Sequence, residues 1–220
     1  MRRTTILNSS AVKQTTFEEA QTSFLKHCKL RNLRPQTIRY YTEDLTYFHA
    51  NVPLRFVGQI TQEVFDNFIF QQLEQGKKVS SLNTRIRGLR VFFKFCAERE
   101  YMKPISPKLM KADKEIKEPY TEAELRKLLK RPETNRWTEW RAWAVIHYLI
   151  STGNRAGTVV SVRISDIDFG AMTIHLKTVK NRRQQIVPLS PALKDILRDY
   201  LKTWEWSEED YLFPSYEGNP

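Results

Sequence analysis

The chain has 220 residues, and its 36 lysines and arginines exceed its 25 acidic residues, which gives a formal net charge of +11. This excess favours a polyanionic partner, either nucleic acid or an anionic membrane surface. Because no run of about 18 apolar residues occurs and residues 1–14 contain no apolar segment, we expect no membrane span, no secretory signal and a cytoplasmic location. The length favours two modest domains.

The positive charge is concentrated in the first half of the chain. Residues 1–110 contain 18 lysines and arginines against 9 acidic residues, whereas residues 111–220 contain 18 against 16. The two cysteines, Cys28 and Cys96, lie in apolar helical patterns and have no partner at metal-ligand spacing. We therefore expect two free, buried thiols, no metal site and no cofactor.

Residues 15–102 are expected to form a four-helix unit with short connections, preceded by a flexible N-terminus over residues 1–14. Thr16 and Glu19 have capping-box spacing ahead of apolar residues at helical intervals. A glycine, Gly76, stands where a left-handed cap would close the third helix. The four helices are expected to begin near residues 16, 35, 61 and 81, and the last to end near residue 99.

Residues 103–118 contain prolines and several lysines and have the composition of a linker. A second domain is expected over residues 119–220, where Thr121 and Glu124 form another capping box. It should contain a Trp-rich helix over about 139–150, strands over 172–176 and 184–189, and a helix from 190 to about 204. The fold class is therefore mainly α with a small β-sheet.

The predicted fourth helix and the loop before it form a basic surface. No acidic residue occurs between Gln75 and Ala97, whereas six cations do. They are Lys77, Lys78, Arg85, Arg87, Arg90 and Lys94. Such a surface suits contacts with nucleic-acid phosphates. The alternative is an ordinary solvated helix face, and the positive charge of the whole chain favours DNA.

A polar turn, Thr152-Gly153-Asn154-Arg155, separates two apolar stretches. An arginine after a glycine-containing turn is usually a surface residue. Here the apolar residues on both sides predict a backbone held against a core, and a guanidinium fixed in this way can grip a phosphate through two parallel hydrogen bonds. Arg155 is therefore a candidate phosphate ligand.

The predicted hairpin of the second domain has a basic tip. Four cations crowd it: Lys177, Lys180, Arg182 and Arg183. A β-hairpin is slim enough to enter a DNA groove. The alternative is a charged turn that protects a sheet edge from pairing with another chain.

The order of these features resembles the tyrosine recombinase family, which includes phage- and transposon-type integrases. The resemblance covers about residues 15–216 and rests on the ordered motifs T-x-x-E-L, TGNR, SDIDF, KNRRQQIVPLS and YLFPS. It implies a SAM-like helical core-binding domain and an α+β catalytic domain that together clamp duplex DNA. It also implies a metal-free reaction in which a tyrosine attacks the scissile phosphate, leaving a 3′-phosphotyrosyl link and a free 5′-hydroxyl.

The resemblance assigns roles to two cations. Arg155 matches the first catalytic arginine, which binds the non-bridging phosphate oxygens and would stabilise the charge of the transition state. Lys180 matches the hairpin lysine, which protonates the departing 5′-oxygen. The choice of Lys180 rests on counting back from Val187-Pro188-Leu189, and Lys177 is its alternative on the same hairpin. The other cations of the basic helix and hairpin would contact DNA.

The sequence departs from the family pattern in two places. Thr158 stands where members often have an acidic residue, three positions after the first arginine. The family's H-x-x-R helix, its later His or Trp and its nucleophilic tyrosine lie beyond the LFPS segment, whereas this sequence ends at Pro220. None of the nine tyrosines follows the expected motifs, and Tyr216 comes too early. We therefore expect a truncated catalytic domain that does not cleave DNA by itself.

The sequence is consistent with three hypotheses. The chain is an integrase cut short within its catalytic domain, a non-catalytic DNA-binding relic or regulator that occupies recombinase sites, or an unrelated basic protein that binds a protein partner. The first two predict double-stranded DNA as partner and no membrane. We expect a monomer in solution, and self-association on DNA for the full-length protein.

Overall fold

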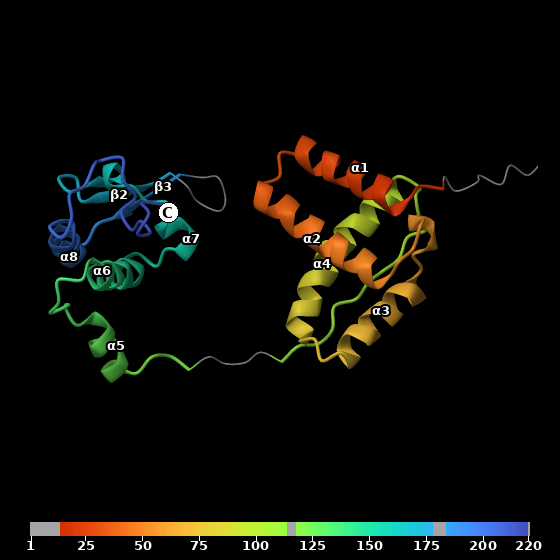
Figure 1. Cartoon of the computed structure of the whole chain (residues 1–220), viewed down its shortest axis with the longest axis horizontal. Helices are drawn as coiled ribbons and strands as arrows, with labels where there is room; N and C mark the ends of the chain where they lie inside the picture. Colours follow the sequence, from red (N-terminus) through yellow and green to blue (C-terminus); the bar gives the residue numbers. More distant parts are fainter. Residues whose placement is uncertain (1–13, 114–117, 178–183, 220) are drawn as a thin grey trace, which may run out of the picture. The chain divides into compact units, whose positions relative to one another are not determined.

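A computed structural model describes residues 14–113, 118–177 and 184–219. The chain divides into two compact units, residues 1–116 and residues 117–220, called here the helical unit and the mixed unit (Figure 1). None of the helices in these described ranges is long and apolar enough to cross a membrane.

The helical unit contains the four expected helices. They are α1 (Phe17–Leu30), α2 (Pro35–Asn51), α3 (Gln62–Glu74) and α4 (Val79–Glu98), with a short 3-10 helix, η1 (Val57–Gln59), before α3. The capping box of α1 is formed, since the Thr16 hydroxyl accepts from the amide of Glu19 and the Glu19 carboxylate accepts from the amide of Thr16. Gly76 follows α3 with a φ of +73°. Helix α4 begins two residues earlier than expected, because the Lys78 carbonyl accepts from the Ser81 and Leu82 amides.

Phenylalanine rings fill the core of the helical unit. Helix α4 packs against α1, α2 and α3, and its Phe92 lies 5.5 Å from the ring centroids of both Phe17 and Phe24. Tilted and edge-to-face arrangements such as these stabilise aromatic cores beyond the burial of their area. Cys28 and Cys96 are free and buried, as expected. Burial raises the pKa of the Cys96 thiol to about 12, which keeps it protonated.

The segment after α4 packs on the helical unit. Met102 is buried, and the Ser106 amide donates to the side chain of Gln62. The Asn83 side-chain amide donates to the Met110 carbonyl and accepts from the Met110 amide, both at 2.9 Å. The first eight residues of the expected linker are therefore attached to the helices.

The mixed unit contains helices and one small antiparallel sheet. Its elements are α5 (Glu122–Leu129), α6 (Trp137–Thr152), α7 (Ala156–Val159), η2 (Ile164–Asp166), β1 (Ile167–Asp168), β2 (Thr173–Leu176), β3 (Gln185–Pro188) and α8 (Pro191–Leu201). The strand order is β1-β2-β3, and Ile174 of β2 pairs with Ile167 on one side and Val187 on the other. The fold is mainly α with a small sheet, as the sequence predicts.

The core of the mixed unit lies around α6 and α8. These helices pack against each other, and the Tyr148 and Tyr200 rings lie 5.5 Å and 5.8 Å from the ring of Phe213. The chain near Phe213 is tied in by the Leu212 amide, which donates to the Val162 carbonyl at 2.7 Å. Helix α8 ends at Leu201, earlier than the expected residue 204.

Candidate nucleic-acid interface and phosphate site

Five of the six cations predicted on and before α4 are exposed: Lys77, Lys78, Arg87, Arg90 and Lys94. Lys94 pairs with Glu98 at 3.7 Å, so its charge is compensated by a neighbouring carboxylate. Because both side chains are largely exposed, this pair contributes little to stability. Within the described ranges, no carboxylate lies within ion-pair distance of Lys78, Arg87 or Arg90. The charges of these three residues are therefore available to bind an anion.

Arg85, the sixth cation, is held by its neighbours. Its Nη1 lies 3.1 Å from Oδ1 of Asp44, and its guanidinium lies 3.6 Å from the centroid of the Tyr47 ring. Asp44 is 6% exposed, and burial raises the pKa of its carboxyl while the charge of Arg85 opposes that rise. Arg85 is thus partly neutralised, and its role as a DNA contact stays a prediction.

Gly88 permits this arrangement. A β-carbon at this position would overlap Oδ2 of Asp44, so the absence of a side chain lets α2 and α4 approach closely. The Tyr40 hydroxyl donates to the Thr84 carbonyl at 2.5 Å, which adds a hydrogen bond between α2 and α4. The pairing of Asp44 with Arg85 could not be foreseen, because the two residues are 41 positions apart in the sequence.

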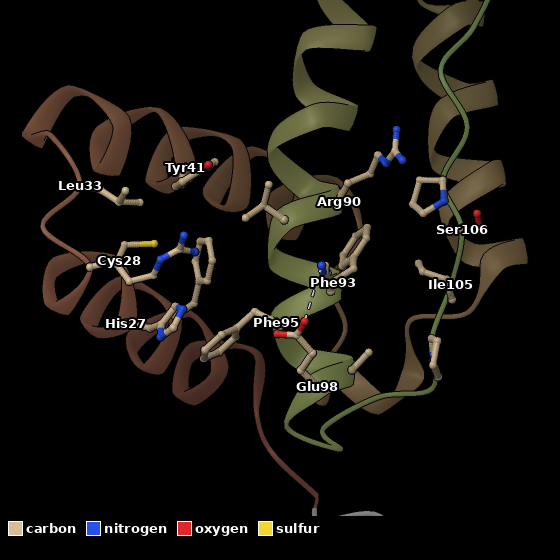
Figure 2. Close-up of a pocket in the computed structure, with 17 residues that line it drawn as sticks. His27, Cys28, Leu33, Tyr41, Arg90, Phe93, Phe95, Glu98, Ile105 and Ser106 are labelled. Atoms are coloured by element: carbon tan, nitrogen blue, oxygen red, sulfur yellow. Dashed lines mark ion pairs between the residues drawn. The ribbon is translucent and has the colours of Figure 1, made fainter. Parts of the chain in front are cut away.

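A cavity of about 680 Å³ opens beside the basic helix. It lies between the end of α1, α4 and the segment after α4 (Figure 2). Figure 2 shows Arg90 extending from α4 toward the segment that carries Ile105 and Ser106, above the ring of Phe93. Arg31 and Lys94 also line it, so three cations of the helical unit border the cavity.

Arg155 stands in a short turn fixed at both ends. Gly153 ends α6 in the left-handed conformation, with a φ of +63°. The Arg155 carbonyl accepts from the amides of Thr158 and Val159, at 2.8 Å and 3.1 Å, and so starts α7. Val159 is buried, which holds this turn against the core, whereas Arg155 itself is exposed. No described residue pairs with its guanidinium.

The turn before Arg155 is tied to a buried phenol. The Asn154 side-chain amide donates to the Tyr148 hydroxyl at 3.4 Å. Burial raises the pKa of Tyr148 to about 12, the hydrogen bond from Asn154 opposes this rise, and the charge of Asp166 adds to it. Thr158, in the place of the acidic residue that the resemblance leads one to expect, is 8% exposed.

The base of the hairpin contains one of its four predicted cations. Lys177 follows β2, and its Nζ lies 2.6 Å from Oδ1 of Asp166, whose side chain is 3% exposed. The other oxygen of Asp166 accepts from the Arg163 amide at 2.9 Å. Lys180, Arg182 and Arg183 lie outside the described residues, so the choice between Lys180 and Lys177 stays a prediction. No cluster of three or more potential metal ligands occurs in the described part of the chain.

Comparison with protein families identifies the family of this chain. Residues 119–220 match the model of the phage integrase family, and residues 22–100 match that of the phage integrase N-terminal SAM-like domain. The chain belongs to the tyrosine recombinase family of phage integrases. The two matched regions lie in the mixed unit and the helical unit, respectively.

Curated relatives agree with this family assignment. The chain is 24% identical to tyrosine recombinase XerD of Halalkalibacterium halodurans over 203 residues, which cover 86% of the chain and 67% of the relative. It is 28% identical to tyrosine recombinase XerC of Thermodesulfovibrio yellowstonii over 187 residues, which cover 82% and 60%. The chain thus spans about two thirds or less of the length of these relatives.

Solved structures share the fold. A lambda integrase tetramer bound to a Holliday junction matches with a TM-score of 0.71 at 17% identity, covering 100% of this chain and 66% of that one. The Tn1549 transposon integrase in complex with transposon right end DNA matches with a TM-score of 0.74 at 14% identity, covering 94% and 73%.

Proposed function

We propose that this chain binds double-stranded DNA and brings two cations, Arg155 and Lys180, to the scissile phosphate in site-specific DNA recombination. Family membership supports this function. The observation that carries it is the unpaired positive charge at the start of α4 and on α4 itself, where Lys78, Arg87 and Arg90 have no acidic partner in the described part of the chain. Cations of this kind release counterions from DNA when they meet phosphates.

Arg155 would stabilise charge on the phosphate. Its backbone is held by the end of α6 and the start of α7, while its guanidinium is exposed and unpaired among the described residues. Such a preorganised donor is strongest where negative charge develops in the transition state. Lys180 would then protonate the departing 5′-oxygen as general acid.

The proposal assigns the nucleophile to none of the nine tyrosines. Tyr148 and Tyr200 are fully buried, and burial raises the pKa of both phenols, so neither can reach a DNA phosphate. Tyr216 is exposed but precedes the position expected from the family motifs. We therefore propose that the 220-residue polypeptide binds DNA without forming a covalent link to it.

The partners follow from the same proposal. We propose duplex DNA as the ligand and self-association on DNA for the complete recombinase, with the 220-residue polypeptide a monomer in solution. Similar solved structures support the DNA ligand and the self-association on DNA, since one is a lambda integrase tetramer bound to a Holliday junction and another is a transposon integrase in complex with transposon DNA. A mobile genetic element is the proposed setting.

The test measures affinity for a labelled duplex as a function of salt. Binding should weaken roughly 100-fold between about 50 and 200 mM salt, because several phosphate contacts each release counterions. A nicked suicide duplex should yield no covalent adduct. No affinity at low salt would refute the proposal and favour a protein-binding role instead. An adduct would refute the proposal that none of the nine tyrosines is the nucleophile. It would also exclude the alternative that the chain is a non-catalytic regulator.

A further inference from the structure

Asp166 joins two segments of the mixed unit. The residue ends η2, and the pairing of Ile167 with Ile174 brings it next to the end of β2. One carboxylate oxygen accepts from the Arg163 amide at 2.9 Å, and the other lies 2.6 Å from Nζ of Lys177. A carboxylate that is 3% exposed requires such partners, because burying an unpaired charge is costly.

The same carboxylate is connected to the Arg155 turn through the segment after α7. It accepts from the Arg163 amide at 2.9 Å, and the amide of the preceding residue, Val162, donates to the Val159 carbonyl of α7 at 3.2 Å. Helix α7 begins directly after Arg155. Hydrogen bonds therefore connect the hairpin base, through Asp166 and the segment after α7, with the turn that carries the candidate phosphate ligand.

We propose that Asp166 is a positioning residue, which anchors Lys177 at the hairpin base and fixes that base relative to the Arg155 turn. This inference rests on the proposed function, because it concerns how the two phosphate-binding segments are held. Lys177 then serves as the anchor of the hairpin rather than as a phosphate contact. The candidate general acid is left to another lysine of the hairpin.

The first test measures the salt dependence of duplex binding for Lys177→Met, with Lys202→Met as control. Lys202 is also an exposed lysine paired with a carboxylate, Asp199, at 3.1 Å. An anchor predicts that the slope of log K against log salt is the same for both variants and the wild-type chain. A slope smaller by about 0.9 in Lys177→Met alone would mean a lost phosphate contact, and would overturn the inference.

The second test measures amide hydrogen exchange. Asp166→Asn and Lys177→Met should each raise exchange at least tenfold both in β2 and at Thr158 and Val159, whose amides donate to the Arg155 carbonyl. Lys177→Arg, which keeps the charge, should retain protection. A merely space-filling role predicts instead that Lys177→Met, which keeps most of the side-chain volume, retains it as well. Unchanged exchange at Thr158 and Val159 would overturn the link to the Arg155 turn.

The two proposals fail in different ways. If the wild-type chain does not bind duplex DNA at low salt, the proposed function is wrong, while the exchange data still decide whether Asp166 holds the two segments. If the wild-type chain binds and Lys177→Met changes the salt slope, the function stands and the anchor is wrong. Should Asp166→Asn fail to fold, the surface variants Lys177→Met and Lys177→Arg still give both results.

Discussion

The two halves of the chain, residues 1–110 and 111–220, contain equal numbers of basic residues, 18 each, but differ in how these residues are compensated. In the helical unit, Lys78 before α4 and Arg87 and Arg90 on α4 face no carboxylate among the described residues. In the mixed unit, Arg126, Lys130 and Arg131 each lie within 2.9 Å of a carboxylate oxygen. Uncompensated cations attract DNA from a distance, whereas paired cations serve local structure.

The buried residues of the two units also differ. The helical unit is filled by phenylalanine rings, eight of which belong to its buried core. The mixed unit also buries the carboxylate of Asp166, which lies between the hairpin base and the segment that follows α7. The helical unit thus presents exposed cations on a core of aromatic rings, while the mixed unit holds a charged group through a buried partner.

The largest expected effect concerns the phenylalanine core. Phe92→Ala should lower the free energy of unfolding of the helical unit by about 3–5 kcal/mol, because it removes a fully buried ring that contacts Phe17 and Phe24. Hydrogen exchange of amides in residues 17–98 measures the loss. Val91→Ala, at an exposed position on the same helix, is the control and should change stability little. Equal losses in both variants would contradict the assigned core.

The next effect tests the positioning role of the mixed unit. In a cleavage-competent recombinase that contains this chain, Arg155→Ala should slow DNA cleavage by about 10²–10³-fold, since it removes a preorganised donor to the phosphate. Binding to the same duplex should stay close to wild type, because one contact among many is lost. Single-turnover cleavage and equilibrium binding separate the two, and wild-type cleavage in this variant would refute the catalytic role.

A smaller effect tests one uncompensated cation. Arg87→Gln should reduce the slope of log K against log salt by about 0.9, the value for one lost phosphate contact. Arg126→Gln is the matched control, because Arg126 pairs with Glu122 at 2.6 Å in the mixed unit. Fluorescence anisotropy at several salt concentrations measures both slopes. An unchanged slope for Arg87→Gln would place the DNA elsewhere.

The smallest effect depends on pH. Burial raises the pKa of Asp44 in the folded chain above its ordinary value of 3.8, so the folded state holds this proton more tightly than the unfolded state does. The resulting contribution to stability is present below pH 3.8 and is lost as pH rises through the raised pKa. Asp44→Asn should therefore gain in stability relative to wild type over this range. Denaturation at several pH values measures the difference, and a constant difference would contradict the raised pKa.

Local sequence signals predict most of the helices. The capping boxes at Thr16 and Thr121 and the glycine at position 76 act within a few residues, so periodicity and spacing are sufficient to place these ends. Strand β1 was missed because two residues are too few to show alternation. Helix α8 was predicted too long, since Lys202 and Thr203 leave the helix in a turn whose amides bond to Asp199 and Tyr200.

The candidate site could be predicted only in part. Arg155 follows a recognisable turn, and the ordered motifs reveal the family. The partners of Arg85 and Lys177 could not be predicted, because Asp44 and Asp166 approach them only after the helices and strands pack. Each buried carboxylate pairs with one cation of a basic cluster, and the sequence does not distinguish that cation from the others in the cluster. Charge counts alone therefore overstate the number of cations available to DNA.

The most direct measurement compares two triple variants in duplex binding. One replaces Lys78, Arg87 and Arg90 with glutamine, and the other replaces Arg126, Lys130 and Arg131, so that both lose three positive charges. We predict that the first reduces the slope of log K against log salt by about 2.7, or about 0.9 for each lost contact, while the second leaves it unchanged. Equal reductions would contradict the account, because binding would then follow net charge alone.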